Sequence, residues 1–164
     1  MRKVCIAASV VVLAAADQLL KWWVQSALSA GRVVRFGGVF ALRYVRNTGA
    51  AFSMLSAHTA LLSVFSAVMI LACLGYLLFG KPRGRLLECA LTMVCAGGVG
   101  NLIDRIRLGF VTDYIELLFV DFAVFNFADM LITVGAFLLI AWLALDSRKG
   151  KRAKPEDAGE DAAQ

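Results

Sequence analysis

Four long apolar runs, separated by polar segments, dominate the pattern of the chain. Their approximate bounds are 4–24, 58–79, 86–103 and 126–145. Each run holds at least 18 residues, which is the length at which an apolar stretch becomes a candidate membrane-spanning helix. Formal charges inside the later runs are few, since the second has none, the third has Glu88 and the fourth has Asp129. The pattern therefore predicts a single membrane domain over residues 1–146, built on four spanning helices.

Two connecting segments show a different pattern, in which apolar and other side chains alternate with a period of two. In the first, Phe40, Leu42 and Tyr44 would share one face; in the second, residues 105–110, every other residue is Ile, Leu or Phe. This period is typical of a strand that lies on an apolar surface. The expected fold class is therefore an all-α polytopic membrane protein with a small extracytoplasmic β-rich region on its outer face.

Positive charges indicate which connections face the cytoplasm. If the N-terminus, the loop at 80–85 and the C-terminal tail are cytoplasmic, they hold ten Lys and Arg residues, against six in the two outer loops. Cytoplasmic loops carry the excess of Lys and Arg in membrane proteins, so both termini are expected inside. The tail, 147–164, is polar and has no apolar periodicity, which predicts a disordered cytoplasmic segment.

Composition strengthens the membrane prediction and excludes other classes. The 164 residues are 60% hydrophobic and 18% charged, with a mean hydropathy of +0.76, whereas soluble domains are about 45–50% apolar and about 25% charged. The net charge of +5 comes from basic clusters beside the apolar runs, which is typical of membrane anchoring. We therefore expect contacts with membrane lipids and no nucleic-acid partner.

The cysteines and the single histidine give no sign of a metal site. No two cysteines form a Cys-x-x-Cys pair, and the only histidine is His58. Structural zinc sites need clusters of such ligands at short spacing. No metal and no cofactor are expected, and the thiols are expected to be unpaired and not catalytic. The four cysteines, all within apolar stretches, are Cys5, Cys73, Cys89 and Cys95.

Polar residues within the predicted spans are costly, which makes them candidates for function. Asp17 and Lys21 stand four residues apart, the spacing of a helical ion pair. In the third span, Gly97 and Asn101 share a helix face with Asp104 or Arg105, and the small residues on that face would allow another backbone to approach closely.

Two further acids are candidates for acid–base chemistry. Asn126 and Asp129 have the spacing of a helix cap and its first-turn partner, while Asp113 interrupts an apolar stretch. Both acids are placed near the outer interface by the predicted topology. Two carboxylates that share a partly buried site do not both ionise readily. One can then accept a proton from water while the other donates a proton to a carbonyl oxygen, as in an aspartic protease.

Two other chemistries fit parts of the pattern. A Ser–Lys dyad would combine Lys21 with Ser53 or Ser56, although no local motif singles out either serine. A small four-helix proton-coupled transporter would use the intramembrane acids as proton carriers, but it would not explain why polar residues gather at one membrane face.

Taken together, the polar motifs resemble those of the lipoprotein signal peptidase family, also called signal peptidase II. They run in order from Asp17 to about residue 134, as Asp-Gln-x-x-Lys at 17–21, Asn-Thr-Gly-Ala-Ala-Phe-Ser at 47–53, Gly-Gly-x-Gly-Asn-x-x-Asp-Arg at 97–105, Val-x-Asp-Tyr-Ile at 111–115 and Phe-Asn-x-Ala-Asp at 125–129. One departure is Phe127, which is bulkier than the aliphatic residue expected there.

The resemblance implies a bacterial inner-membrane aspartyl endopeptidase. Such an enzyme cleaves the signal peptide of a prolipoprotein just before a cysteine that carries diacylglycerol, requires no metal and is inhibited by globomycin-type peptides. The resemblance also implies that Asp113 and Asp129 are the catalytic pair near the outer face. The positions that would bind substrate or support the site are Asp17, Lys21, Asn47, Gly97, Asn101, Arg105 and Asn126.

Overall fold

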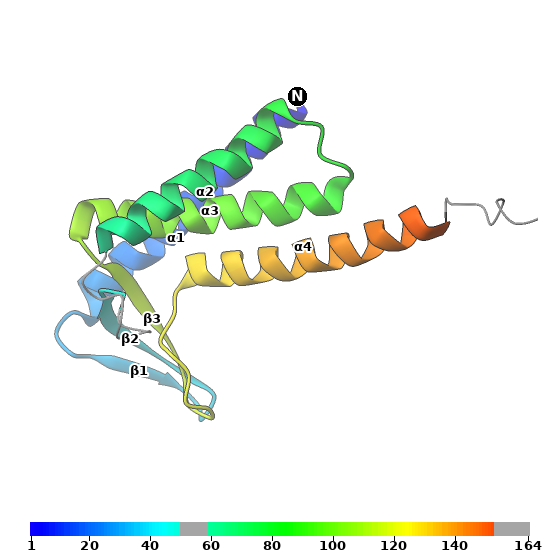
Figure 1. The fold of residues 1–164 in the computed structure, drawn as a ribbon. Coiled ribbons are helices and arrows are strands. Elements are labelled where there is room, and N and C mark those ends of the chain that lie inside the picture. Colours follow the sequence, from blue (N-terminus) through cyan, green and yellow to red (C-terminus); the bar gives the residue numbers. More distant parts are fainter. Residues whose placement is uncertain (50–58, 153–164) are drawn as a thin grey trace, which may run out of the picture.

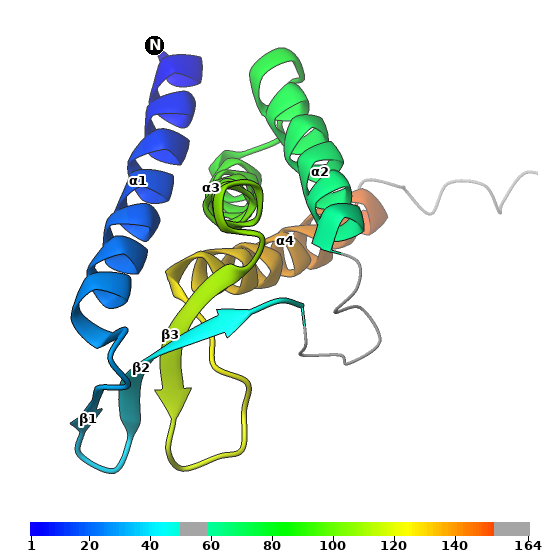
Figure 2. The ribbon, with the colours of Figure 1, turned by 90° about the vertical axis from the view of Figure 1, so that its left-hand side faces the viewer.

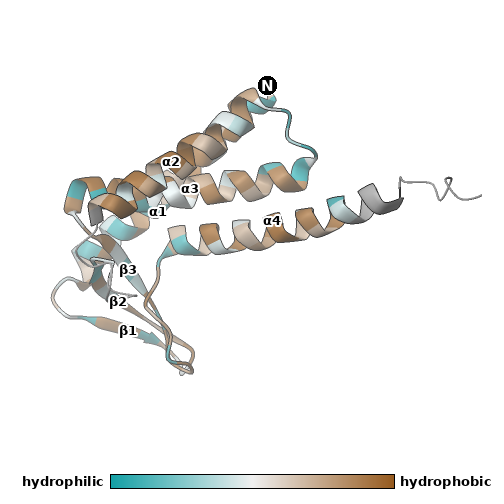
Figure 3. Cartoon of the chain, viewed as in Figure 1, coloured by the Kyte–Doolittle hydropathy of each residue, from teal (hydrophilic) through white to brown (hydrophobic). Residues whose placement is uncertain are grey.

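Four long helices form the body of the protein, and a small sheet extends from one end of them (Figure 1). The computed structural model describes residues 1–49 and 59–152. The helices are α1 (Arg2–Leu28), α2 (Thr59–Phe79), α3 (Arg85–Leu108) and α4 (Phe127–Arg152). Each is long and apolar enough to cross a membrane, and apolar residues cover most of their length (Figure 3). The prediction of four spanning helices is confirmed.

Helix α3 is the centre of the bundle, because α1, α2 and α4 all pack against it (Figure 2). The core between the helices includes Val10 from α1, Leu77 from α2, Cys95 from α3 and Leu131 from α4. The outer surfaces of the helices expose many large apolar side chains, more than a monomeric soluble protein presents in one patch. A lipid environment accounts for this outer surface. All four cysteines are free.

Glycines on α3 let its neighbours approach closely, as predicted. A Cβ added to Gly97 would overlap the main-chain oxygen of Ala128, and one added to Gly100 would overlap a carboxylate oxygen of Asp17. No side chain larger than hydrogen fits at these two positions without a shift of α4 or α1.

The sheet consists of β1 (Val33–Phe36), β2 (Phe40–Asn47) and β3 (Val111–Leu117) in antiparallel order β1-β2-β3. The predicted strand at 40–45 is confirmed. Val45 pairs with Asp113 and Asn47 with Val111, so Asn47 and Asp113 are diagonal neighbours on one face of the sheet. The register thus directs Asn47 towards a candidate catalytic acid.

The predicted strand at 105–110 is wrong, because α3 continues through Leu108. The helix ends at Gly109, which adopts a left-handed conformation (φ 77°) and donates its N–H to the main-chain oxygen of Arg105. This is the usual end of a helix at glycine. Leu and Arg are strong helix formers. A short alternation of apolar residues among them therefore does not stop the preceding helix from continuing. The second outer strand begins only at Val111.

Besides α3, which was predicted to end at residue 103, two more helices are longer than the apolar pattern predicts. Helix α1 continues to Leu28 rather than ending near residue 24. Helix α4 includes residues 147–152, so the prediction of a disordered tail from 147 is wrong for these six residues. Adding a residue to an existing helix costs little, because each new residue adds a backbone hydrogen bond. The rest of the predicted tail, 153–164, lies outside the described residues.

The end of the bundle opposite the sheet is held together by contacts among α1, α3, α4 and the α2–α3 loop. The guanidinium of Arg2 pairs with the Glu88 carboxylate and donates to the main-chain oxygen of Pro82, and the Trp142 indole N–H donates to the main-chain oxygen of Arg83 at 2.9 Å. The N-terminus, this loop and the C-terminal half of α4 therefore lie at one end of the bundle; that this end faces the cytoplasm stays a prediction.

Candidate active site

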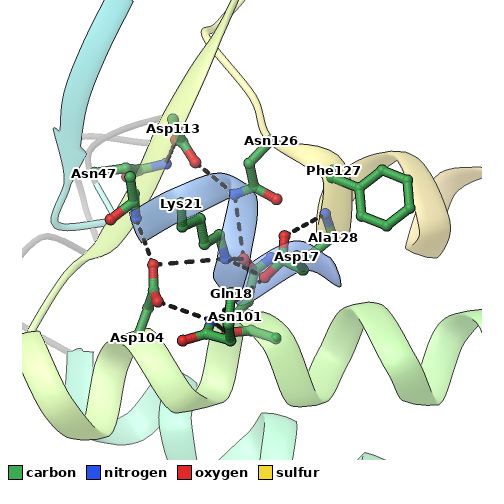
Figure 4. A network of polar contacts seen from close by, with 12 residues as sticks. Asp17, Gln18, Lys21, Asn47, Asn101, Asp104, Asp113, Asn126, Phe127 and Ala128 are labelled. Atoms are coloured by element: carbon green, nitrogen blue, oxygen red, sulfur yellow. Dashed lines mark hydrogen bonds and ion pairs between the residues drawn. The ribbon is translucent and has the colours of Figure 1, made fainter. Parts of the chain in front are cut away.

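Buried and partly buried polar side chains from α1, β2, β3, α3 and α4 meet where the sheet joins the helices (Figure 4). Seven of them are at most 5% exposed: Asp17, Lys21, Asn101, Asp104, Thr112, Asp113 and Asn126. Unpaired polar groups are costly inside an apolar surrounding, so the hydrogen bonds among these residues are what allow them to be buried together.

Asp113, on β3, is held by two amide side chains. Asn47 Nδ2 donates to its Oδ2 and Asn126 Nδ2 donates to its Oδ1, both at 2.7 Å. Burial raises the pKa of Asp113 from the ordinary 3.8 to about 6; the Asn47 hydrogen bond opposes this rise, the negative charge of Asp129 adds to it, and Asn126 and Lys21 oppose it. This carboxyl group can therefore hold or release a proton near neutral pH.

Asp129, in the first turn of α4, is fixed by Asn101 and by a reciprocal cap. Asn101 Nδ2 donates to Asp129 Oδ1 at 2.7 Å. Asp129 Oδ2 accepts the main-chain N–H of Asn126 at 3.1 Å, while Asn126 Oδ1 accepts the N–H of Asp129 at 2.9 Å. This is the capping arrangement that the spacing predicted. Asn126 Nδ2 also donates to Asn101 Oδ1 at 3.2 Å, so two asparagines link the two acids.

The predicted ion pair of α1 forms, and it supports the same network. Lys21 Nζ lies 2.9 Å from Asp17 Oδ2, 2.8 Å from Asn101 Oδ1 and 3.5 Å from Asp104 Oδ2. With three oxygen partners and 1% exposure of its side chain, Lys21 is a fixed cation that orients Asn101. The predicted serine partners, Ser53 and Ser56, lie outside the described residues.

The first three amides of α4 each donate to a side chain from a different element. Phe127 N–H donates to the Tyr114 hydroxyl oxygen on β3 at 3.2 Å, and Ala128 N–H donates to Asp17 Oδ1 on α1 at 3.0 Å. The third, of Asp129, is the one capped by Asn126. A helix start has no internal partners for these amides, so the position of Asp129 depends on α1 and β3 as well as on α4.

A set of residues connects α1, α3 and β3, and the sequence pattern did not predict its contacts: Gln18 and Asp104 stand in the quoted motifs without an assigned role, and Gln25 and Thr112 were not singled out. Gln18 Nε2 donates to Asp104 Oδ1 at 3.1 Å, and Asp104 Oδ2 accepts the N–H of Thr112 at 2.8 Å. Gln25 Nε2 donates to the Thr112 hydroxyl oxygen at 2.7 Å. The available signal was the polar face of the first apolar run, since Gln18, Lys21 and Gln25 recur at helical spacing.

In the described ranges, two predicted site residues, Gly97 and Arg105, and the departing residue Phe127 make no side-chain hydrogen bond to the two acids. Gly97 provides close packing between α3 and α4. Arg105 is partly buried and interacts electrostatically with Asp129 and Asp113, but within the described part of the chain its guanidinium makes no hydrogen bond. Phe127 packs on both apolar clusters, and its ring points away from the polar network (Figure 4).

A metal centre has no obvious ligands in this region. Among residues 1–49 and 59–152, no group of three or more His, Cys, Asp or Glu side chains is placed to hold a metal ion. The chemistry available from these side chains is acid–base chemistry by the carboxyl groups, with asparagine amides as orienting donors.

The fold and the site together define a class, a multi-pass membrane protein with two linked carboxyl groups at one end of its helix bundle. Comparison with known proteins makes the class more specific. The family model for "Signal peptidase (SPase) II" matches residues 9–145. The chain belongs to the signal peptidase II family, and its class is peptidase rather than transporter.

Individual relatives cover most of the chain. A protein of Streptococcus thermophilus (strain CNRZ 1066), named "Lipoprotein signal peptidase", is 41% identical over 85% of this chain and 92% of its own length. A protein of the same name from Streptococcus pyogenes serotype M5 (strain Manfredo) is 40% identical over 87% and 95%. A solved structure described as "Bacterial membrane enzyme structure by the in meso method at 2.3 A resolution" has the same fold, with a TM-score of 0.79 at 24% identity over 98% and 94%.

Proposed function

We propose that this protein is an aspartyl endopeptidase that removes signal peptides from diacylglyceryl-modified prolipoproteins by cleaving before the lipidated cysteine. The observation that carries the proposal is the link between Asp113 and Asp129 through Asn126 and Asn101. The family to which the chain belongs and the names of its relatives support the substrate class. The alternative, a proton-coupled transporter, has no support from the family.

In the proposed reaction, the two acids have different roles. Asp113 holds a proton and donates it to the oxygen of the scissile carbonyl, which the raised pKa of Asp113 supports. Asp129 is the base that takes a proton from the attacking water. It lies in the first turn of α4 and accepts hydrogen bonds from Asn101 and from the main-chain N–H of Asn126, which orient its carboxyl group.

The membrane placement in this proposal has the sheet and the site at the outer face of a bacterial inner membrane, with both termini in the cytoplasm. A signal peptide is itself an apolar helix, so its scissile bond would lie near this interface while the diacylglyceryl chains remain in lipid. Globomycin-type peptides would bind at the same end and block cleavage. The gathering of all the buried acids of the network at the sheet end supports this placement.

Amide substitution of each acid tests the proposal. Asp113→Asn and Asp129→Asn keep the shape of the side chain but remove the titrating proton, so cleavage of a lipidated prolipoprotein by purified protein should fall by about 10²–10⁴-fold. The effects should not multiply in the double variant, because the pair acts as a unit.

Asp121→Asn is the matched control, since Asp121 is an exposed acid in the loop between β3 and α4 and should leave turnover unchanged. Thermal unfolding in detergent verifies that each variant is folded. Turnover near that of the unmodified protein in either folded variant would refute the aspartyl mechanism. Loss of cleavage in Ser53→Ala or Ser56→Ala, with both Asn variants active, would instead support the Ser–Lys dyad.

A further inference from the structure

A groove lies between α1 and α3 at the end of the bundle opposite the polar network. Its volume is about 830 Å³, within the range of about 300–1,000 Å³ for small-molecule sites. Apolar side chains line its inner part, among them Ile6, Leu13 and Met93, while Arg2, Arg85 and Glu88 line the part nearest the α2–α3 loop. The groove is thus polar at the membrane surface and apolar deeper in.

Positive charge dominates the polar end of this groove. Among the described residues that line it, Glu88 is the only acid, and it is already paired with Arg2. Arg85 is exposed, and within the described residues its side chain has no ion pair. The charge that would complement this end is therefore negative.

The start of α3 adds hydrogen-bond donors at the same place. Gly84 caps this helix without any side-chain hydrogen bond, and it lines the groove together with Arg85. Uncapped amides at a helix N-terminus attract anions, and phosphate groups in particular. Deeper in the groove, Thr92 is only 8% exposed and lines the wall, and within the described residues its hydroxyl has no hydrogen-bond partner. It offers a buried donor to an ester or hydroxyl oxygen.

The length of the groove matches one leaflet of a membrane. From Arg2 to Leu13 the helix rises by about 16 Å, at about 1.5 Å per residue. The hydrocarbon core of a bilayer is about 30 Å thick, so the groove extends from the membrane surface to about the midplane. An acyl chain with its headgroup at the surface fits this depth.

We propose that the groove between α1 and α3 binds one anionic glycerophospholipid of the leaflet opposite the active site. The phosphate lies beside Arg85 and the first amides of α3, and one acyl chain follows Ile6 and Leu13 towards the midplane. A second copy of the chain is a poorer occupant, because its corresponding end would carry the same positive charge. The proposal concerns binding and does not depend on the peptidase activity.

Native mass spectrometry of the full-length protein in detergent, titrated with dioleoyl-phosphatidylglycerol or dioleoyl-phosphatidylcholine, tests the proposal. The unmodified protein should retain one phosphatidylglycerol with clearly higher affinity than phosphatidylcholine. Arg85→Gln should reduce phosphatidylglycerol affinity about fivefold, the effect of one cation near an anionic lipid. Arg83→Gln is the matched control, because it removes the same charge two residues before Arg85, from a side chain that does not line the groove, and it should leave phosphatidylglycerol affinity unchanged.

Steric block of the apolar part gives an independent test. Ser9 lines the groove, so Ser9→Phe should abolish retention of the bound lipid, whereas Val11→Phe, at an exposed position that does not line it, should leave retention unchanged. Equal affinity for both lipids, unchanged binding in both Arg85→Gln and Ser9→Phe, or a dimer in place of a lipid adduct would overturn the proposal. Cleavage assays on the same samples separate loss of lipid from loss of catalysis.

Discussion

The surroundings of Asp113 determine the pH above which the proposed reaction should slow. Its pKa is raised to about 6, mainly by burial, and the strongest opposing contribution is the hydrogen bond from Asn47. Since the mechanism needs this group protonated, kcat/KM should decline as pH rises through about 6. The negative charge of Asp129 contributes to the raised pKa of Asp113, so the limit reports on the pair of acids and not on Asp113 alone.

Asn47→Ala should move this alkaline limb to higher pH. The amide of Asn47 favours the ionised form of Asp113, so its removal favours the protonated form and raises the pKa further. The measurement is a pH profile of kcat/KM for both proteins. Thr48→Ala, which changes the adjacent exposed side chain, should leave the profile in place. A shift to lower pH in Asn47→Ala would contradict the assigned role of Asp113.

Tyr114 is a positioning residue that the sequence motif did not distinguish. Its hydroxyl oxygen accepts the first amide of α4, and burial raises the pKa of this phenol above its usual value. Tyr114→Phe leaves a partly buried N–H unpaired, which costs about 1–3 kcal/mol.

The expected result is a lower midpoint of thermal unfolding for Tyr114→Phe and a lower kcat with little change in KM, because Asp129 follows the start of α4. Tyr44→Phe removes a comparable hydroxyl, which accepts from Arg46 on the sheet, and should not change kcat. An unchanged kcat in Tyr114→Phe would exclude the positioning role.

At the scale of single residues, the sequence predicted contacts between residues of one helix better than contacts between residues of different elements. The Asp17–Lys21 pair and the Asn126–Asp129 cap depend on spacing of four and three residues, which helix geometry makes readable. The contact from Asp17 to Ala128 crosses 111 positions, and no local pattern reports it. Gln18, Thr112 and Tyr114 received no assigned role for the same reason, since the contacts that make them important are with partners on other elements.

At the scale of elements, helix existence was predictable and helix ends were less so. Apolar runs located all four helices, but the last turns of α1, α3 and α4 depend on propensity and on glycine, not on burial. Residues 105–108 show this most clearly, because a strand-like alternation there is overruled by the helix that leads into it.

Gly100 provides the sharpest test of packing between elements. Gly100→Ala places a methyl group against the Asp17 carboxylate, so it should destabilise the protein by about 1–3 kcal/mol and weaken the support of α4. Gly75→Ala in α2 is the control, because nothing lies near its added methyl group, and alanine favours helix. The check is thermal unfolding in detergent with parallel cleavage assays; equal stability of the two variants would contradict the packing argument.

On the scale of the whole molecule, the sheet and the loop before α4 lie at one end of the helix bundle, and the N-terminus and the α2–α3 loop lie at the other (Figure 1). Chemical labelling can show which side of the membrane each end faces. The four cysteines should first be replaced by Ala or Ser with most activity kept, because none is paired and none touches the network. Asp121→Cys in that background should then react with an impermeant reagent in intact cells, and Arg83→Cys only after the membrane is opened. The reverse pattern would invert the proposed topology.

The cap on α4 has a consequence for how the protein is made. The three amides before and at Asp129 need partners from the first helix, from the last strand and from the residue that opens the fourth helix. In the order of the sequence, Asp17 and Tyr114 are synthesised before the ribosome reaches Asp129. A chain that has not reached residue 129 has one acid without its counterpart, so under the proposed mechanism we expect it to have no hydrolytic activity.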